Sequence, residues 1–477
     1  MGAEQVTLGR LATVTAGQLV GPADVEINDV THDSRSAGPG DLFVAIRGSN
    51  RDGHDFIAGA NASAACVEDL ADVALPQIVV ADTRRVLPLL AAEVHGHPSR
   101  RLDVVGVTGT NGKTTVTHML ASVVSASGRL PGVVGTVGAR IGDDRVDIER
   151  TSPEATDFQR LLARMVAKKV QVAAVEVSSH AVVLGRVDAT EFRVVAFTNL
   201  SQDHLDFHTD MEEYFAAKAR LFTDGAGSAV ICVDEVWGRR LVELTDRDVI
   251  TTGSRGIIRA RSLVDGLEMS RFDLVTPEGA VPIELPIGGS FNVSNALVAA
   301  GCARVLGLSL EAIGTGLMNM EPIPGRMEVI DAGQEFRILV DYAHTPDGIN
   351  EVLDTVRPLV AGRTLVVVGA GGDRDQAKRP AMGEAVSRAD VAFITSDNPR
   401  TEDPAEIVAQ VAAGAGEAAE LVLEPNRRTA IEMAISIAEA GDVVLILGKG
   451  HEPGQEIGGR VIPFDDRVVA REAVIGA

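Results

Sequence analysis

The chain has 477 residues, 45% of them hydrophobic, and a formal net charge of −23. This length predicts about three domains, and the acidic charge disfavours polyanionic partners, namely nucleic acids and membrane surfaces. The three cysteines are widely spaced, and no apolar run approaches the roughly 18 residues of a membrane helix, so we expect a cytoplasmic protein without a membrane span.

The first part of the chain predicts a mixed α/β domain, which we place at residues 1–97. Short β-like runs, DLFVAI at 41–46 and QIVVA at 77–81, lie among glycine, proline and aspartate residues. The polar segment HGHPSRRLD at 95–103 contains a proline and predicts a linker to the next domain.

A second region, residues 98–327, has the alternation of strands and helices that is typical of a parallel sheet covered on both faces. Its clearest helices are expected at 112–126 and 211–222. Its strands are nearly continuous runs of valine, isoleucine and alanine, expected at 103–107, 172–177, 194–199 and 228–233.

The same alternation restarts after a proline-containing break at 321–328, and this third region, residues 328–477, predicts a Rossmann-like α/β domain. Strands are expected at 337–342, 364–370, 391–396 and 443–448, and helices at 346–359, 405–415 and 428–440. Ligands bind at the carboxyl ends of strands in such sheets. Polar clusters follow four of the strands, at Asp341, Gly371–Arg374, Asp397–Arg400 and Gly448–Glu452.

The segment VVGVTGTNGKTT at 104–115 predicts a site for a nucleoside triphosphate. A strand enters a glycine-rich turn and a helix leaves it, so backbone N–H groups can surround a phosphate while Lys113 adds a positive charge. Thr114 follows this lysine, where its hydroxyl can reach Mg²⁺. The usual motif has glycine where this chain has Val107, and the alternative interpretation is a plain turn between strand and helix.

Candidate magnesium ligands follow two of the expected strands, with Glu176 after one and Asn199, Asp203 and His204 after the next. Mg²⁺ prefers oxygen ligands, although an acid or a histidine in a loop is usually just solvated. His204 and His208 have the spacing of a zinc pair, but the segment HLDFH lacks the glutamate of H-E-x-x-H, so we discount zinc.

Eight short motifs follow one another over essentially the whole chain: GTNGKTT, EVSSH, TNLSQDHLD, YFAAK, FNVSN, PGRME, DYAHTP and GKGHE. In these motifs and their order the chain resembles the Mur ligases, the ATP-dependent amide-forming enzymes of peptidoglycan synthesis. The N-terminal DSRSAGPGDLFVAIRG is similar to the uridine-nucleotide domain of the tripeptide synthetases of that family. The resemblance implies a ligase of cell-wall biogenesis, which serves cell shape and cell division.

The resemblance also implies an ATP site shared by the two larger domains. Arg326 and Asp341 would close over ATP from the hinge and the third domain. Two Mg²⁺ ions would be held by Thr114, Glu176, His204 and a carbamylated Lys218, in which CO₂ converts a cation into an anionic oxygen ligand. The helix pattern by itself predicts that Lys218 is solvated. The phosphate and adenine contacts would be Gly109, Thr110, Asn111, Gly112, Lys113, Thr114, Thr115, Asn292 and Asn295.

For the nucleotide-sugar substrate, a UDP-muramoyl dipeptide, the resemblance implies contacts in the first two domains. The chain departs from the family at two positions nearby, with Arg150 in place of a common asparagine and Leu184 where some members have glutamine. The matching binding positions are Ser34, Ser49, Asn50, Arg51, Thr151, Ser152, Ser178 and Arg186.

The stretch DNPR at 397–400 indicates which amino acid is added. The diaminopimelate-adding members of the family carry it, whereas lysine-adding members typically lack the arginine. The Arg400 guanidinium can hold the second carboxylate of meso-diaminopimelate with two parallel hydrogen bonds, and we expect an arginine left without that carboxylate to reject lysine. The other implied contacts are Arg374, Asp397, Asn398 and Pro399, with Gly448 and Glu452 on the side of the far ammonium.

The implied reaction begins when ATP phosphorylates the terminal carboxylate of D-glutamate, and the amine of the incoming amino acid then attacks the acyl phosphate. We expect a monomer whose third domain swings on the segment 321–328 to exclude water. The alternatives are the same ligase adding L-lysine, a folylpolyglutamate synthetase-like ligase, a phosphate-loop NTPase acting as a motor or switch, and a non-enzymatic relative. The N-terminal domain argues against the second alternative, and the intact Lys113, Glu176, His204 and Lys218 argue against the last.

Overall fold

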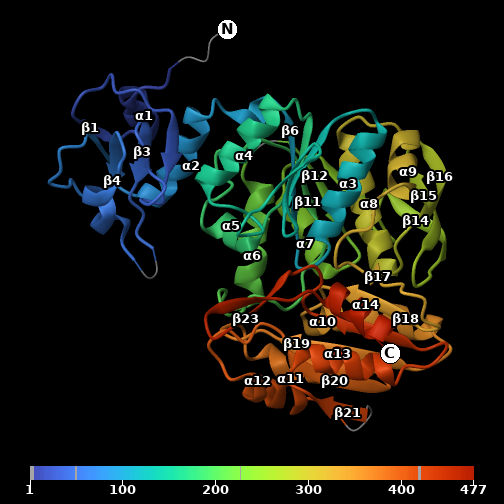
Figure 1. Ribbon diagram of the computed structural model, residues 1–477. Helices are drawn as coiled ribbons and strands as arrows, with labels where there is room; N and C mark the ends of the chain where they lie inside the picture. The colour runs from blue at the N-terminus through green and yellow to red at the C-terminus, as the bar shows by residue number, and fades with distance from the viewer. Residues whose placement is uncertain (1–4, 49–50, 226, 417–419, 477) are drawn as a thin grey trace.

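The structure is a computed structural model that describes residues 5–48, 51–225, 227–416 and 420–476. Figure 1 shows three α/β regions in chain order, with the N-terminal one (blue) beside the central one and the C-terminal one (orange and red) below it in this view. Ser49 and Asn50, two of the implied substrate contacts, lie outside the described residues. Within the described ranges, no helix has both the length and the apolar character needed to cross a membrane.

The N-terminal region is a five-stranded sheet with the strand order β1-β5-β4-β3-β2, in which only the β1–β5 pair is antiparallel. The segment 95–103, expected to be a linker, packs against the central region, because the Ser99 hydroxyl accepts a hydrogen bond from the Glu191 amide over 3.1 Å. The elements are α1 (Leu8–Thr15), β1 (Gln18–Val20), β2 (Asp29–Thr31), β3 (Asp41–Val44), β4 (Ala64–Val67), β5 (Gln77–Val79) and α2 (Thr83–Val94).

Ion pairs join this region to α4 (Ala155–Ala167) and to the residue before it. Arg84 of α2 donates to Glu154 over 2.7 Å, and Arg160 of α4 donates to Asp29 of β2 over 3.0 Å. These pairs are partly buried, so solvent screens them less than it screens fully exposed pairs. The N-terminal region is therefore fixed beside the loop before α4, which carries two of the implied substrate contacts.

The central region is built on an eight-stranded sheet with the order β13-β12-β11-β6-β10-β7-β8-β9. The strands from β13 to β7 are parallel, as expected. The edge formed by β7, β8 and β9 is antiparallel and was not expected. The strands are β6 (Asp103–Thr108), β7 (Pro131–Gly135), β8 (Gly138–Ile141), β9 (Asp144–Val146), β10 (Val172–Glu176), β11 (Phe192–Phe197), β12 (Ser228–Cys232) and β13 (Val249–Thr252).

Helices cover both faces of this sheet, and a small antiparallel sheet, β14-β15-β16, packs against α9. The prediction of a covered, mainly parallel sheet is confirmed. The helices are α3 (Lys113–Ala126), α4, α5 (Ser179–Val183), α6 (Met211–Thr223), α7 (Val236–Leu244), α8 (Ser290–Val305) and α9 (Leu310–Met318), and the added strands are β14 (Arg259–Val264), β15 (Ser270–Thr276) and β16 (Gly279–Leu285).

Residues of β6 explain why the phosphate loop departs from the usual motif. Val107 is fully buried in the core that also contains Val116 of α3, whereas Val104 points into the core on the other face. A Cβ on Gly106 would lie 2.8 Å from the ring of Phe192. Packing, and not phosphate contact, therefore determines where glycine and valine stand in this strand.

The C-terminal region is a six-stranded sheet with the order β17-β18-β22-β19-β20-β21, in which only β17 is antiparallel to its neighbour. The Rossmann-like prediction is confirmed. The strands are β17 (Glu328–Val329), β18 (Arg337–Asp341), β19 (Thr364–Ala370), β20 (Val391–Ser396), β21 (Glu420–Leu423) and β22 (Val443–Leu447), followed by a hairpin of β23 (Gly454–Ile457) and β24 (Arg460–Pro463). The helices are α10 (Pro346–Val356), α11 (Lys378–Val386), α12 (Pro404–Ala412), α13 (Arg427–Ser436) and α14 (Asp466–Gly476).

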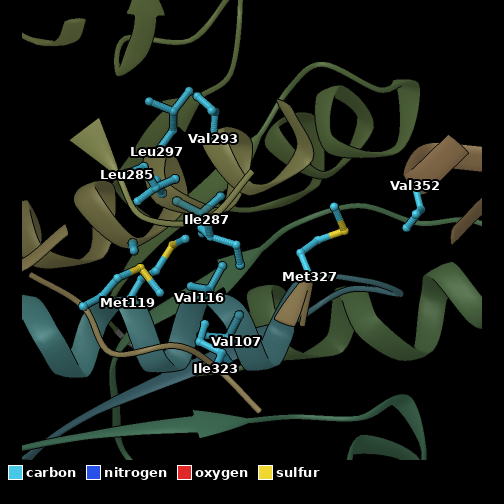
Figure 2. Close-up of a cluster of buried hydrophobic side chains, with 14 of the residues drawn as sticks. Val107, Val116, Met119, Leu285, Ile287, Val293, Leu297, Ile323, Met327 and Val352 are labelled. Atoms are coloured by element: carbon cyan, nitrogen blue, oxygen red, sulfur yellow. The ribbon is translucent and has the colours of Figure 1, made fainter. Parts of the chain in front are cut away.

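One apolar core continues from the central region into the C-terminal region. Figure 2 shows Val116 of α3 near Ile323, and Met327 lying between them and Val352 of α10. All four side chains are at most 4% exposed. The segment that connects the two regions is therefore anchored by buried side chains, and it brings the phosphate loop close to the C-terminal sheet.

Candidate active site

The candidate active site lies where loops of the central and C-terminal sheets meet. Arg326, just before β17, donates to the Thr114 hydroxyl over 3.0 Å. His451, after β22, hydrogen bonds to the carbonyl of Thr136, after β7, over 3.2 Å. Loops at the carboxyl ends of β6, β7 and β22 therefore border one site, as is common in open α/β sheets.

The phosphate loop needs its glycines and closes around its own lysine. Gly109 and Gly112 have φ angles of +148° and +83°, and a Cβ on Gly112 would lie 2.1 Å from Asn295 Oδ1. Lys113 Nζ donates to the carbonyls of Gly109 and Thr110 over 3.0 and 2.8 Å. The Thr110 and Asn111 N–H groups of the loop donate to the Asn199 carbonyl and Oδ1 over 3.0 and 2.8 Å, so the N–H groups at the start of α3 are the ones placed to meet a phosphate.

Lys218 is not solvated, so the expectation from the helix pattern is wrong. Its side chain, on α6, is 1% exposed, its Nζ donates to the Gly109 carbonyl over 3.0 Å, and it lies 4.4 Å from the centre of the Tyr214 ring. Burial lowers the pKa of Lys218 well below its ordinary value, and the charge of Lys113 lowers it further. A neutral amine is a nucleophile, which is the form that reacts with CO₂.

Glu176 ends β10 as a buried carboxylate. Its Oε1 accepts from the Thr136 amide over 2.9 Å, and its Oε2 accepts from the Thr136 hydroxyl over 3.0 Å. Burial lowers the pKa of Lys113, and Glu176 opposes that shift, so the two charges act on each other. Glu176 thus faces the phosphate loop with lone pairs that remain free for a cation.

Asp203 links the central region to the C-terminal region. It is 6% exposed, and its carboxylate lies 3.5 Å from His204, 3.8 Å from His344 and 3.5 Å from Lys378 of α11. Burial would raise the pKa of Asp203, but these three neighbours outweigh it and hold the pKa below its usual range. The sequence did not reveal Lys378, because nothing in the pattern of α11 distinguishes this lysine from a solvated one.

His204 is suited to bind a metal as a neutral imidazole. Burial lowers its pKa to about 3, although Asp203 opposes this. Its backbone is left-handed, with a φ of +57°. His208 does not join it, because it is buried and shares a hydrogen bond of 3.0 Å with the Ser179 hydroxyl.

The donors fit magnesium that arrives with a nucleotide. In the part of the chain that the structure describes, no three His, Cys, Asp or Glu side chains are grouped closely enough to hold a metal ion by themselves. The Thr114 hydroxyl, the Glu176 carboxylate and the neutral His204 remain available, and Mg²⁺ usually completes its shell with waters and phosphates.

A cavity of ≈ 100 Å³ lies next to the phosphate loop on the side of the two implied adenine contacts. It is lined by Asn111 and Asn295 from the central region and by Glu351 of α10, and the Asn111 Nδ2 is buried without a partner among the described residues. Asn295 in turn donates to Asn292 over 3.2 Å. Burial, together with the carboxyl groups around it, raises the pKa of Glu351 to about 7.

Arg326 reaches this loop from the C-terminal side, and Asp341 holds the segment that carries it. The Arg326 guanidinium stacks 4.4 Å from the centre of the Tyr342 ring, and its Nε is buried without a partner among the described residues. Asp341 accepts from the amides of Met327 and Ala343, each over 2.8 Å. Asp341 therefore fixes the backbone that carries Arg326.

Four of the implied substrate contacts form one hydrogen-bonded group near Glu176. Ser152 donates to the Glu176 carbonyl over 2.9 Å and accepts from the Ser178 amide over 3.1 Å. The Thr151 and Thr136 hydroxyls are 3.1 Å apart, and Arg186 donates to the Ser152 carbonyl over 3.3 Å. Ser34 and Arg51 are in loops of the N-terminal region, and their roles stay predictions.

The implied amino-acid contacts lie past the carboxyl ends of β19, β20 and β22. Arg400 has a φ of +53°, donates to the Gly372 carbonyl over 2.6 Å, and pairs with Glu456 of β23 over 3.2 Å. Arg400 therefore has a carboxylate partner within the protein, and its role in rejecting lysine stays a prediction. Arg374 is exposed, and Pro399 accepts a backbone hydrogen bond that closes the turn after Arg400.

Further contacts show that the turns after β20 and β22 pack closely against each other. A Cβ on Gly448, which has a φ of +114°, would lie 2.8 Å from Asp397 Oδ2. Asn398 donates to Glu452 over 2.8 Å, and the buried Lys449 donates to both of them, over 3.0 and 2.9 Å. Sequence reasoning missed Lys449, although it lies within the GKGHE motif, because no local pattern signals a buried lysine.

Comparison with protein families gives three adjacent matches. They are "Mur ligase family, catalytic domain" at residues 26–95, "Mur ligase middle domain" at 107–303, and "Mur ligase, glutamate ligase domain" at 325–450. The three matches together span most of the chain.

Curated relatives match over nearly the whole chain. A UDP-N-acetylmuramoyl-L-alanyl-D-glutamate–2,6-diaminopimelate ligase of Streptomyces avermitilis is 43% identical, covering 94% of this chain and 93% of the relative. A ligase of the same name from Geobacillus thermodenitrificans is 44% identical, covering 93% and 94%.

Solved structures agree with these relatives. A structure of a ligase of that same name has a TM-score of 0.70 and 30% identity, and the match covers 99% of each chain. A MurF ligase from Thermotoga maritima in complex with ADP has a TM-score of 0.65 at 18% identity, covering 94% and 96%, and this likeness concerns the fold alone.

Proposed function

The chain belongs to the Mur ligase family, and from this premise we propose that it is an ATP-dependent ligase that adds meso-diaminopimelate to the D-glutamate of UDP-N-acetylmuramoyl-L-alanyl-D-glutamate. The observation that carries the proposal is the 43% and 44% identity, over at least 93% of the chain, with relatives of that one name. The product is an amide in peptidoglycan biosynthesis, and small molecules are the partners.

In the first step, the terminal carboxylate of D-glutamate attacks the γ-phosphorus of ATP, and ADP leaves. Two anions approach each other in this step, so the site must supply positive charge. Lys113 and the N–H groups of the phosphate loop supply it at the start of α3, and Arg326 adds a guanidinium from the other side. The hydroxyls of Ser152 and Thr151 lie beside Glu176 and would position the acceptor.

Magnesium would be held by the Thr114 hydroxyl, Glu176, His204 and a carbamate on Lys218, and two ions are expected. When bound, Mg²⁺ offsets phosphate charge during phosphoryl transfer. The carbamate forms when the neutral Lys218 Nζ attacks the carbon of CO₂ and loses one proton. The burial of this lysine, which lowers its pKa well below the ordinary value, supports the proposal, because a protonated amine has no free electron pair.

In the second step, an amino group of meso-diaminopimelate attacks the acyl carbon, the amine loses its proton, and phosphate leaves as the amide forms. Arg400 and Glu452, after the ends of β20 and β22, would bind the far end of the amino acid, and Asn398 donates to Glu452. This arrangement matches a substrate that carries both a carboxylate and an ammonium group on its far carbon.

Closure of the third domain on the segment 321–328 would exclude water from the acyl phosphate. The contacts of Arg326 with Thr114 and of Lys378 with Asp203 are those that closure would make and opening would break. We further propose a monomer that acts in the cytoplasm, where ATP and nucleotide-linked substrates are available.

An amino-acid panel tests the proposal. ADP release is measured with the UDP-muramoyl dipeptide present and with meso-diaminopimelate, L-lysine or no amino acid added. We expect turnover with diaminopimelate only. Turnover with L-lysine at a similar kcat/KM would favour the lysine-adding alternative. Turnover with a folate and glutamate would favour a folylpolyglutamate synthetase-like ligase, and ATP hydrolysis without any amino acid would favour a motor or switch.

A further inference from the structure

Lys449 is a fully buried lysine at the edge of the sheet where the amino acid would bind. Its side chain is 0% exposed, and it follows directly after β22 and Gly448. Its Nζ donates to Asn398 Oδ1 over 3.0 Å and to Glu452 Oε2 over 2.9 Å. A buried ammonium group is costly unless it is paired and hydrogen bonded, so these two contacts explain how the fold tolerates it.

Both donors that reach Glu452 bind the same oxygen. Lys449 and the Asn398 side-chain amide donate to Oε2, over 2.9 and 2.8 Å. The other oxygen, Oε1, has no hydrogen-bond donor among the described residues, and 32% of the Glu452 side chain is exposed. One carboxylate oxygen is thus anchored and the other is left to accept from a ligand.

Asn398 itself has little capacity left for a ligand. Its Oδ1 accepts from Lys449 and from the Glu456 amide over 3.0 Å each, which uses both lone pairs, and its amide nitrogen donates to Glu452. An ammonium group of a substrate needs an acceptor, and the Asn398 oxygen no longer offers one. Toward the far ammonium, the implied contact of Asn398 is therefore replaced by a role through Glu452.

We propose that Lys449 is a positioning residue of the amino-acid site: together with Asn398 it anchors Glu452 by one oxygen, so that the other oxygen receives the far ammonium of meso-diaminopimelate. Lys449 does not contact the substrate, because it is completely buried. The inference rests on the proposed function and adds to it the residue that holds Glu452, which the resemblance already places on the side of the far ammonium.

The electrostatics of Glu452 agree with this arrangement. Burial would raise its pKa, but Lys449 and Asn398 outweigh burial and hold the pKa below its usual value. His451 on the same loop adds a weaker effect of the same sign. Glu452 also interacts with Arg427 of α13, whose main partner is Asp466 at 2.7 Å, and with Tyr342 after β18. Asp397 acts on both groups as well, and Asp203 acts on Tyr342. Glu452 therefore stays charged at neutral pH.

The test replaces Lys449 by methionine, which has a similar length and no charge. With Lys449→Met, we expect the KM for meso-diaminopimelate to rise about 10-fold to 100-fold, because the far ammonium loses one charge-assisted hydrogen bond. The KM values for ATP and for the UDP-muramoyl dipeptide should not change. Lys449→Gln, which keeps a hydrogen-bond donor, should show a smaller rise, and it carries the test if the methionine variant does not fold.

Two readouts separate positioning from a general loss of structure. The first is the preference for meso-diaminopimelate over 2-aminopimelate, which lacks the far amino group. This preference should fall in Lys449→Met and in Glu452→Gln alike, and the double variant should be no worse than Glu452→Gln. The second is the pH profile of kcat/KM for diaminopimelate. Its acidic limb, where kcat/KM falls as the pH is lowered, should move to higher pH in Lys449→Met, because Glu452 loses the cation that keeps it ionised.

Asp442→Asn is the matched control, because Asp442 precedes β22 at its opposite end. Its buried carboxylate accepts from the Arg363 amide and guanidinium over 2.6 and 2.8 Å, so its loss should lower the melting temperature but not change the KM for diaminopimelate. The inference is overturned if Lys449→Met or Lys449→Gln leaves unchanged both the preference for diaminopimelate over 2-aminopimelate and the acidic limb of the kcat/KM profile. A wild-type enzyme without diaminopimelate-dependent ADP release overturns the proposed function instead.

Discussion

Lys113 of the phosphate loop and Lys218 of α6 donate to the same backbone oxygen: each Nζ lies 3.0 Å from the carbonyl of Gly109. Two ammonium groups on one acceptor repel each other, and Lys218 is the more deeply buried of the two. The conflict is relieved if Lys218 is neutral, and relieved further if it becomes an anion. The loop that would bind ATP and the lysine that would be carbamylated are thus coupled through one peptide group.

The first prediction concerns Lys218. We expect Lys218→Ala to lower kcat by at least about 1,000-fold, since it removes both the carbamate and a group that contacts the phosphate loop. Added acetate or formate should restore part of the activity, whereas added bicarbonate should not.

Lys168→Ala is the control for Lys218, because Lys168 is 63% exposed and pairs with Asp144. It should leave kcat unchanged. A carbamate carbon signal after exposure of the wild-type protein to carbon-13-labelled CO₂, absent in Lys218→Ala, would confirm the modification directly. Near-normal kcat in Lys218→Ala would refute the role of this lysine.

The second prediction concerns the shape of the phosphate loop. Gly112→Ala should raise the KM for ATP about 100-fold, because a Cβ would lie 2.1 Å from Asn295 Oδ1 and displace the turn. Gly128→Ala is closely matched, with a φ of +79° against +83° and no atom within 4 Å of the added Cβ. Both variants should lose about 1 kcal/mol of stability from backbone strain. If both raise the KM for ATP equally, strain and not the clash would be responsible.

The third prediction concerns the choice of amino acid. Arg400→Ala should lower kcat/KM for meso-diaminopimelate by about 100-fold, because two charge-assisted hydrogen bonds to the far carboxylate are lost. The low activity with L-lysine, which lacks that carboxylate, should change little. The measurement is the ratio of the two kcat/KM values.

Glu456→Gln is the informative companion to Arg400→Ala, because it removes the carboxylate that pairs with Arg400 over 3.2 Å. It should leave the KM for diaminopimelate unchanged or lower it. An increase comparable to that of Arg400→Ala would mean that Glu456 itself contributes to binding.

The fourth prediction concerns pH and Glu351, whose pKa in the folded protein is raised from 4.5 to about 7. A carboxyl with a raised folded-state pKa contributes stability that is fully present below the unfolded pKa, and that is lost as the pH rises through about 7. The Glu351→Gln variant has no ionisable group at this position, so its unfolding free energy should not fall for this reason. Relative to this variant, the wild type should therefore lose about 2 kcal/mol of unfolding free energy between pH 5 and pH 8.

Urea unfolding of both proteins at several pH values measures this difference. At pH 5 the Glu351 carboxyl is still protonated in the folded protein, so most of this loss of unfolding free energy should not yet have occurred. A constant difference from pH 5 to pH 8 would show that burial and the surrounding carboxyl groups do not act on Glu351 as described.

Sequence patterns predicted the parts of the fold that depend on neighbouring residues. The runs around β6, β10 and β22 are continuous and apolar, so the burial of these strands on both faces could be predicted from the sequence. The edge strands β8 and β9 were not expected, because their short, partly polar sequences pair only through the tertiary fold.

The same distinction holds for the site. The glycines and Lys113 could be identified locally, whereas the burial of Lys218 and Lys449 depends on partners 109 and 51 residues away in the chain, Gly109 and Asn398. A helix or loop pattern carries no information about such partners. The contact between Asp203 and Lys378 crosses two regions, and it was inaccessible to sequence reasoning for the same reason.

The pair between Arg400 and Glu456 changes how selectivity has to be understood. If the far carboxylate of diaminopimelate binds Arg400, it competes with an internal carboxylate, so binding would be an exchange of one anion for another. Lysine would leave the internal pair intact, so it would be disfavoured because it gains no ion pair, and not because it leaves a cation unpaired. The exchange would also run backwards, because Glu456 would pair with the guanidinium again as the tripeptide departs.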